Sequence, residues 1–194
     1  MYTIVKIQDA VQGYLSITVL EGNENRQYTI RTVIYTELGS PSRGDEITDE
    51  QLSAMRDADE YYRAKRAALS ILSYGDNNTR TLITKLRARS ISESIAEEVV
   101  GEMISLGYID ERRQLERLIV EYTNRKLLGP KKTVPRLLSK GYAISDIKDT
   151  YESLSCAGEI DIEKNKELLI EKYLGGDRDA EATRRLLFKY GYDF

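Results

Sequence analysis

The chain has 194 residues with a formal net charge of −3, and 31% of its residues are charged and 8% aromatic, as in soluble globular proteins. It has no histidine and a single cysteine, which excludes Ser-His and Cys-His nucleophile pairs, histidine-containing zinc sites and an internal disulfide. No apolar run approaches the roughly 20 residues that a membrane span needs, and the first residues lack a signal-peptide core, so we expect a cytoplasmic protein.

Residues 1–40 predict a small β-rich N-terminal extension. Residues 3–7, 14–20 and 27–30 are rich in β-branched and alternating apolar residues, and Gly13 and the cluster 21–25 separate them as turns. An antiparallel meander is therefore expected. The pattern of residues 31–38 favours a short helix that ends at Gly39.

From residue 48 onward, apolar residues recur at helical spacing. Thr48 and Gln51 match a capping box, and the helix they open is expected to run, with or without a break, to about Ser73. Residues 74–77, which begin with Tyr74, are expected to stop it. Further helices are expected after the N-cap residues Asn78, Ser92, Asp110, Thr133 and Asp179, and around Ile144–Leu154 and Ile162–Tyr173. Thr133 is the expected N-cap of its helix because it places Pro135 in the first turn, where a missing N–H costs nothing. Gly107, Gly141, the pair Gly175-Gly176, and Gly191 are expected to end helices.

A repeat of about 50 residues organises these helices. Leu86, Leu137 and Leu187 each stand four residues before a small residue, namely Ser90, Gly141 and Gly191. The unit is predicted to hold three helices, of which the second is short and basic. The copies cover 48–106, 110–155 and 160–194, the last with two helices. The predicted fold is mainly α, with tandem three-helix repeats that stack into an elongated curved body behind the β extension.

Ordered motifs over residues 44–194 resemble the RecX family of bacterial recombination regulators. The motifs are Gly44–Ile47, Ala67–Leu72, Lys85-Leu86, Gly107–Glu111, Gly129–Lys131 and Leu137–Gly141. Thr81 and Glu111 depart from the family pattern, in which acidic residues are usual at both places and the second is an aspartate, and the third repeat stops at Phe194. The resemblance implies tandem three-helix repeats and a regulatory role without enzymatic activity. It also implies a monomer that binds the RecA filament on single-stranded DNA, lodges in its groove and limits strand exchange and ATP hydrolysis, in homologous recombination, DNA repair and the SOS response.

Three windows carry cations and no acid, at residues 77–92, 122–145 and 182–192, so all 32 acidic residues lie elsewhere. Such faces are suited to an acidic protein groove or to phosphates, although solvated helix faces would give the same pattern. The candidate partner-binding residues, for RecA or DNA, are Arg80, Lys85, Arg87, Arg89, Arg125, Lys126, Lys131, Lys132, Arg136, Lys140, Arg184, Arg185 and Lys189.

Two further functional classes are weighed against filament binding. The first is a nucleic-acid-binding module whose basic helices hold phosphates directly; the second, an enzyme, lacks support, because no phosphate-binding loop, dinucleotide fingerprint or metal-ligand spacing occurs. No catalytic residue, metal or cofactor is therefore predicted, and Asp110 is interpreted as a helix cap. The tyrosines are interpreted as core residues unless one is exposed beside a basic window, where it would be able to stack on bases.

Overall fold

The computed structural model describes residues 1–175 and 179–193, and its N-terminal part is a four-stranded antiparallel sheet. Strands β1 (Tyr2–Asp9), β2 (Tyr14–Glu21) and β3 (Glu24–Arg31) form the predicted meander, and β4 (Glu46–Ile47) adds to β1, in the order β3-β2-β1-β4. Two residues of β4 are too few to give a recognisable alternation. Helix α1 (Thr32–Glu37) follows β3, and Gly39 after it is left-handed, as predicted.

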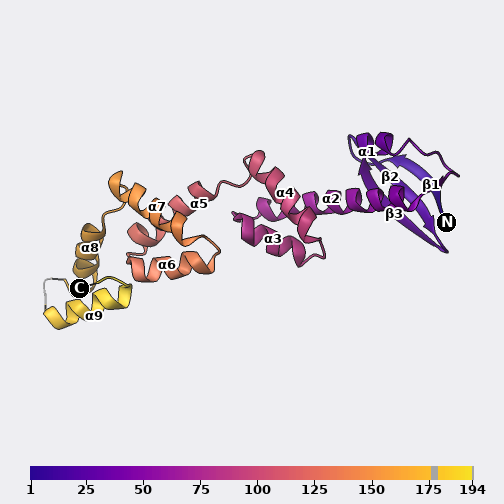
Figure 1. Ribbon diagram of the computed structural model, residues 1–194. Helices are drawn as coiled ribbons and strands as arrows, with labels where there is room; N and C mark the ends of the chain where they lie inside the picture. The colour runs from indigo at the N-terminus through magenta and orange to yellow at the C-terminus, as the bar shows by residue number, and fades with distance from the viewer. Residues whose placement is uncertain (176–178, 194) are drawn as a thin grey trace. The chain divides into compact units, whose positions relative to one another are not determined.

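One face of the sheet is covered by the first half of the long helix α2, which spans Asp49–Ser73 without a break (Figure 1). The predicted capping box is present: the hydroxyl of Thr48 accepts from the Gln51 amide, and the Gln51 side chain accepts from the Thr48 amide. Leu52 and Met55 of α2 bury themselves against Ile17 and Ile30 of the sheet. This contact fixes the start of α2 on the β extension.

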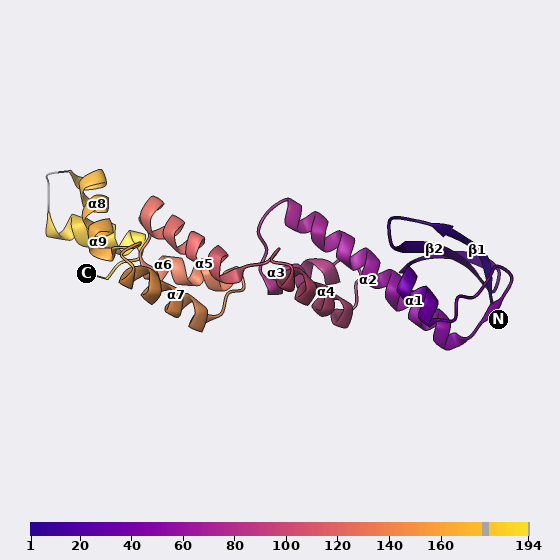
Figure 2. The same cartoon turned by 90° about the horizontal axis from the view of Figure 1, so that it is seen from above.

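The second half of α2 packs against α4 (Glu93–Ser105), which lies beside it with α3 (Thr79–Arg87) in Figure 2. Ala64 and Ala68 are fully buried on α2. Their small side chains let the α4 helix approach closely. Leu82 and Leu86 of α3 are buried as predicted, with Asn78 capping α3 by accepting from the Thr81 amide at 2.8 Å.

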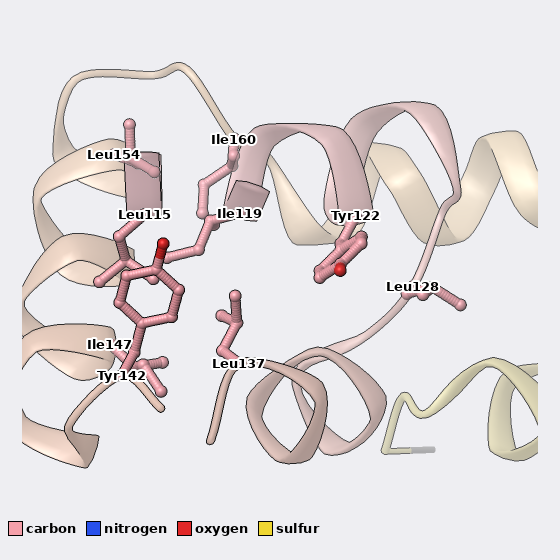
Figure 3. Close-up of a cluster of buried hydrophobic side chains, with 9 residues drawn as sticks. All are labelled: Leu115, Ile119, Tyr122, Leu128, Leu137, Tyr142, Ile147, Leu154 and Ile160. Carbon is pink, nitrogen blue, oxygen red and sulfur yellow. The ribbon is translucent and has the colours of Figure 1, made fainter. Parts of the chain in front are cut away.

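The chain divides into two compact units, 1–75 with 82–106, and 76–81 with 107–194. The second unit contains the helices α5 (Glu111–Val120), η1 (Glu121–Arg125), α6 (Pro130–Ser139), α7 (Ile144–Cys156), α8 (Ile162–Leu174) and α9 (Ala180–Tyr190). Its main core is the cluster in Figure 3, where side chains of α5 and η1 face Leu137 of α6 and the ring of Tyr142. A smaller cluster joins α8 and α9 through Leu169, Leu187, Tyr192 and Leu127.

The predicted start of α6 was wrong. The helix begins at Pro130 with Gly129 as its N-cap, and Thr133 lies buried inside it, where its hydroxyl donates to the Gly129 carbonyl at 3.1 Å. Proline suits the first helical position because its missing N–H has no intrahelical partner there. Gly129-Pro130 is therefore a start signal as well as a break, and Pro135 is accommodated in the helix interior.

The mainly α class with a small N-terminal antiparallel sheet is confirmed. Asp110 and Asp179 cap α5 and α9 as predicted, each accepting from the amide three residues on. The repeat boundaries 48–106, 110–155 and 160–194 remain a prediction, and Gly176 and Phe194 lie outside the described residues. In the described ranges, no helix has both the length and the apolarity needed to cross a bilayer.

Candidate functional site

The short basic helices α3, α6 and α9 end in the same way. The residue four after the reference leucine (Leu86, Leu137 or Leu187) is left-handed, with φ of 62° at Ser90, 96° at Gly141 and 87° at Gly191. The next residue, Ile91, Tyr142 or Tyr192, is buried, and its amide donates back to the leucine carbonyl at 3.4, 3.3 and 3.0 Å. This shared Schellman-type end gives a common register for comparing the three windows.

In this register the first two windows share three cation positions, and the third window has no cation at these positions. Cations stand six before, one before and three after the leucine in the first two: Arg80, Lys85 and Arg89, then Lys131, Arg136 and Lys140. The third window has Glu181, Leu186 and Tyr190 at these places. Its pair Arg185 and Lys189 lies one residue earlier, about 100° round the helix axis. The cations of the third window therefore lie on a different face of their helix from those of the first two windows, a difference that the acid-free window alone does not reveal.

All thirteen predicted cations are exposed, as a partner-binding role requires. Ion pairs join Arg87 to Glu93 at 3.2 Å, Lys126 to Glu121 at 2.6 Å, Arg185 to Glu181 at 2.9 Å, and Lys131 to Asp193. Within residues 1–175 and 179–193, no carboxylate lies within 4 Å of Arg125, Lys132, Arg136, Lys140 or Arg184. Four of these five cations lie in the middle window, which therefore carries a strong uncompensated charge.

Around Glu121 the middle window forms a compact cationic cluster. Hydrogen bonding from Lys126, with the nearby charges of Lys126, Arg125 and Lys140, lowers the pKa of Glu121. The π-helical turn η1 widens the backbone here and sets the Lys126 Nζ 4.7 Å from the centre of the Tyr122 ring. One carboxylate among three cations leaves a net positive surface.

The third window borders a hollow of about 470 Å³ with mixed charge. Arg184, Arg185 and the exposed ring of Phe188 line it together with the carboxylates of Glu181 and Asp193. Both carboxylates are already paired, with Arg185 and Lys131. This hollow therefore offers a partner an apolar anchor and fewer uncompensated cations than the middle window.

One exposed aromatic residue beside a basic window escaped the sequence prediction. Tyr74, interpreted only as part of a helix stop, is the C-cap residue of α2, is 90% exposed, and lines a hollow with Lys85 and Arg89. Its position before Gly75 is the usual signal of a helix end, and no local pattern distinguishes it from the core tyrosines.

The motif Gly129-Pro130-Lys131 has a structural role that explains its residues. Gly129 donates its amide to the Tyr190 carbonyl at 2.9 Å, and Lys131 donates its amide to the Gly191 carbonyl. A Cβ at Gly129 would lie 2.3 Å from the Gly191 oxygen, so only glycine fits. The motif joins the start of α6 to the end of α9, and its lysine side chain pairs with Asp193 beyond that end.

No family model matches the chain, but curated relatives and solved structures do. It is 26% identical to the regulatory protein RecX of Clostridium acetobutylicum over 171 residues, which are 88% of this chain and 78% of that protein. It is also 26% identical to the regulatory protein RecX of Streptococcus gordonii over 175 residues, 89% of this chain and 64% of that protein. A crystal structure of a regulatory protein RecX, 20% identical, superposes with a TM-score of 0.70 and covers 100% of this chain and 95% of that one. The chain therefore resembles RecX proteins in sequence over most of its length, and in fold.

The family prediction made from the motifs is confirmed. RecX of Lactobacillus salivarius has the same fold at a TM-score of 0.60 and 22% identity, covering 71% of this chain and 91% of that structure. The match to RecX of Clostridioides difficile is 28% identical and spans about half of that protein, 52%, and 58% of this chain. The RecX relatives are named as regulatory proteins rather than as enzymes.

Proposed function

We propose that this RecX-family protein regulates the RecA recombinase by binding its filament on single-stranded DNA and inhibiting strand exchange and ATP hydrolysis. The observation that carries the proposal is the exposed cationic cluster of the middle window, in a chain whose family is named for regulation. An acidic protein groove complements such a surface. The protein would act in the cytoplasm, by occupying the groove of the filament and hindering its changes of state.

Charge is expected to set orientation and association rate more than affinity. Arg125, Arg136 and Lys140 are exposed, and among the described residues they have no carboxylate within 4 Å. Their field therefore extends into solvent, where it is screened over about 8 Å at physiological ionic strength. Inhibition should weaken as salt is raised, because exposed charges across an interface mainly raise the association rate, and salt screens them.

RecA-dependent ATP hydrolysis on single-stranded DNA tests the proposal directly. We expect this protein to reduce the steady-state rate when it is present at fewer copies than RecA, because one copy in the groove would affect neighbouring protomers. A rate that is unchanged even at equimolar protein would contradict the proposed function.

A matched pair of variants tests the role of the middle window. The double variant Arg136→Gln and Lys140→Gln removes two exposed charges, and we expect the concentration for half-inhibition to rise about three- to thirtyfold. Lys148→Gln removes an exposed charge on α7, outside the three windows, and should leave inhibition unchanged. Equal inhibition by the double variant and the unmodified protein would exclude this surface as the binding face.

A further inference from the structure

Tyr74 is the most exposed aromatic residue beside a basic helix. It caps the C-terminus of α2, and its backbone amide donates to the Ile71 carbonyl at 3.3 Å, so the residue is held while its ring is 90% exposed. An aromatic ring held in water costs hydrophobic free energy. Elsewhere in this chain tyrosines such as Tyr122, Tyr142 and Tyr192 are buried in the cores.

The surroundings of Tyr74 combine a flat apolar floor with positive charge. The ring shares a hollow of about 340 Å³ with Ile71 and Ala88, and the side chains of Lys85 and Arg89 line the same hollow. Lys85 lies in the last turn of α3 and Arg89 two residues beyond its end, and both line the same hollow. Among the described residues, none that lines this hollow is acidic.

The second repeat lacks this combination, which makes the first site distinctive. Counted from the reference leucine, the place of Tyr74 is taken in the second repeat by Arg125. The pair equivalent to Lys85 and Arg89 is Arg136 and Lys140. The middle window therefore has a third cation where the first window has an exposed aromatic ring beside the same pair of cations.

We infer that the hollow of Tyr74, Lys85 and Arg89 binds one nucleotide of a single-stranded nucleic acid. An unpaired base stacks on the Tyr74 ring above Ile71 and Ala88, and the adjoining phosphates contact Lys85 and Arg89. A double helix does not fit this chemistry, because its bases are not free to stack on a side chain. The site is independent of the proposed regulation of RecA, since it needs no protein partner.

A fluorescence reporter tests the stacking directly. The chain has no tryptophan, so Tyr74→Trp in the full-length protein places a single indole in the hollow. Titration with an oligothymidylate of about 12 nucleotides should quench the indole emission to a plateau. A strand of the same length with abasic sugars should quench it little. Unchanged emission up to saturating oligothymidylate, or equal quenching by the abasic strand, would overturn the inference.

Affinity measurements separate the aromatic contact from the ionic ones. Loss of one stacked base should weaken binding of labelled oligothymidylate to Tyr74→Ala by about 5- to 150-fold, whereas Tyr74→Phe should bind like the unmodified protein. Tyr74→Ala should keep the salt dependence. Lys85→Gln with Arg89→Gln should reduce the slope of log affinity against log salt by about 1.4, since each phosphate contact on a single strand contributes about 0.7.

Two controls keep the test decisive. Tyr108→Ala removes another tyrosine that is more than half exposed, outside the basic windows, and should not alter binding. Thermal unfolding of Tyr74→Ala should match the unmodified protein, because the ring makes few contacts. Because no recombinase is present, a negative result would reject the nucleotide site and leave the proposed function untouched. If Tyr74→Ala binds oligothymidylate as well as the unmodified protein does, the inference is wrong.

Discussion

The left-handed residue after each basic helix is the residue on which the ends of α3, α6 and α9 depend. A residue other than glycine is strained in this left-handed backbone conformation by about 1–2 kcal/mol. Ser90 already carries that strain at φ of 62°, whereas Gly141 and Gly191 avoid it. The three equivalent positions therefore form a natural substitution series.

We expect Ser90→Gly to raise the free energy of unfolding by about 0.5–1 kcal/mol, after the entropy that glycine loses on folding is counted. Gly141→Ala should cost about 1 kcal/mol, since the nearest atom to its Cβ is Arg80 Cδ at 3.3 Å, on a flexible side chain. Gly191→Ala should cost about 2–4 kcal/mol, because its Cβ would lie 2.8 Å from the backbone nitrogen of Lys132. Urea unfolding midpoints give the order, and equal losses at Gly141 and Gly191 would contradict the argument.

At the scale of elements, Glu102 joins α2 to α4. Its carboxylate accepts from Tyr61 and Lys65, both at 2.6 Å. Burial alone would raise the pKa of Glu102, but the hydrogen bonds from Lys65 and Tyr61 outweigh it, and the pKa is lowered. The folded state therefore favours the ionised carboxylate. This stabilisation is complete above the unfolded-state pKa of about 4.3 and is lost as the pH falls through the lower folded-state value.

Glu102→Gln should accordingly lower the free energy of unfolding by about 1 kcal/mol at pH 7, the scale of a partly exposed ion pair with an added hydrogen bond. The difference from the unmodified protein should shrink as the pH falls below 4. Glu97→Gln, at an exposed position of the same helix, is the control and should show little difference at either pH. A difference at pH 7 that persists undiminished at pH 3 would show that packing rather than charge joins the helices.

Element ends marked by local chemistry could be predicted, and those set by distant contacts could not. Thr48, Asp110 and Asp179 cap helices through amides three residues away, so their roles are visible in the sequence. The start of α6 depends on Gly129 meeting the end of α9, some sixty residues on, which no local pattern records. The π-helical turn at 121–125 likewise leaves no periodic signal.

At the scale of the whole chain, the same division applies to the candidate surface. Its thirteen cations were found from acid-free windows, because exposure follows from charge. The helix faces that carry these cations could not be predicted. The one-residue offset of Arg185 and Lys189 appears only when the three helices are aligned by their C-terminal ends. Tyr74 was missed because a tyrosine's exposure depends on whether another element covers it, and the sequence holds no record of that.

The division of cores gives a prediction for the whole chain. Ile17 is fully buried in the sheet-α2 core of the first unit, and Ile119 is fully buried in the α5–α7 core of Figure 3 in the second. Replacing either by valine removes one methylene and should cost about 0.5–1.5 kcal/mol. If each core is a separate cooperative unit, the loss stays within its own unit.

Amide hydrogen exchange measures this locally. Ile119→Val should speed exchange of the protected amides in α5, α6 and α7 by about 2- to 13-fold and leave those of β1–β3 unchanged, and Ile17→Val should do the reverse. The two variants are controls for one another, since the chemical change is identical and only its place differs. Equal acceleration of both sets of amides by either variant would mean that the chain opens as one cooperative unit, in spite of its two cores.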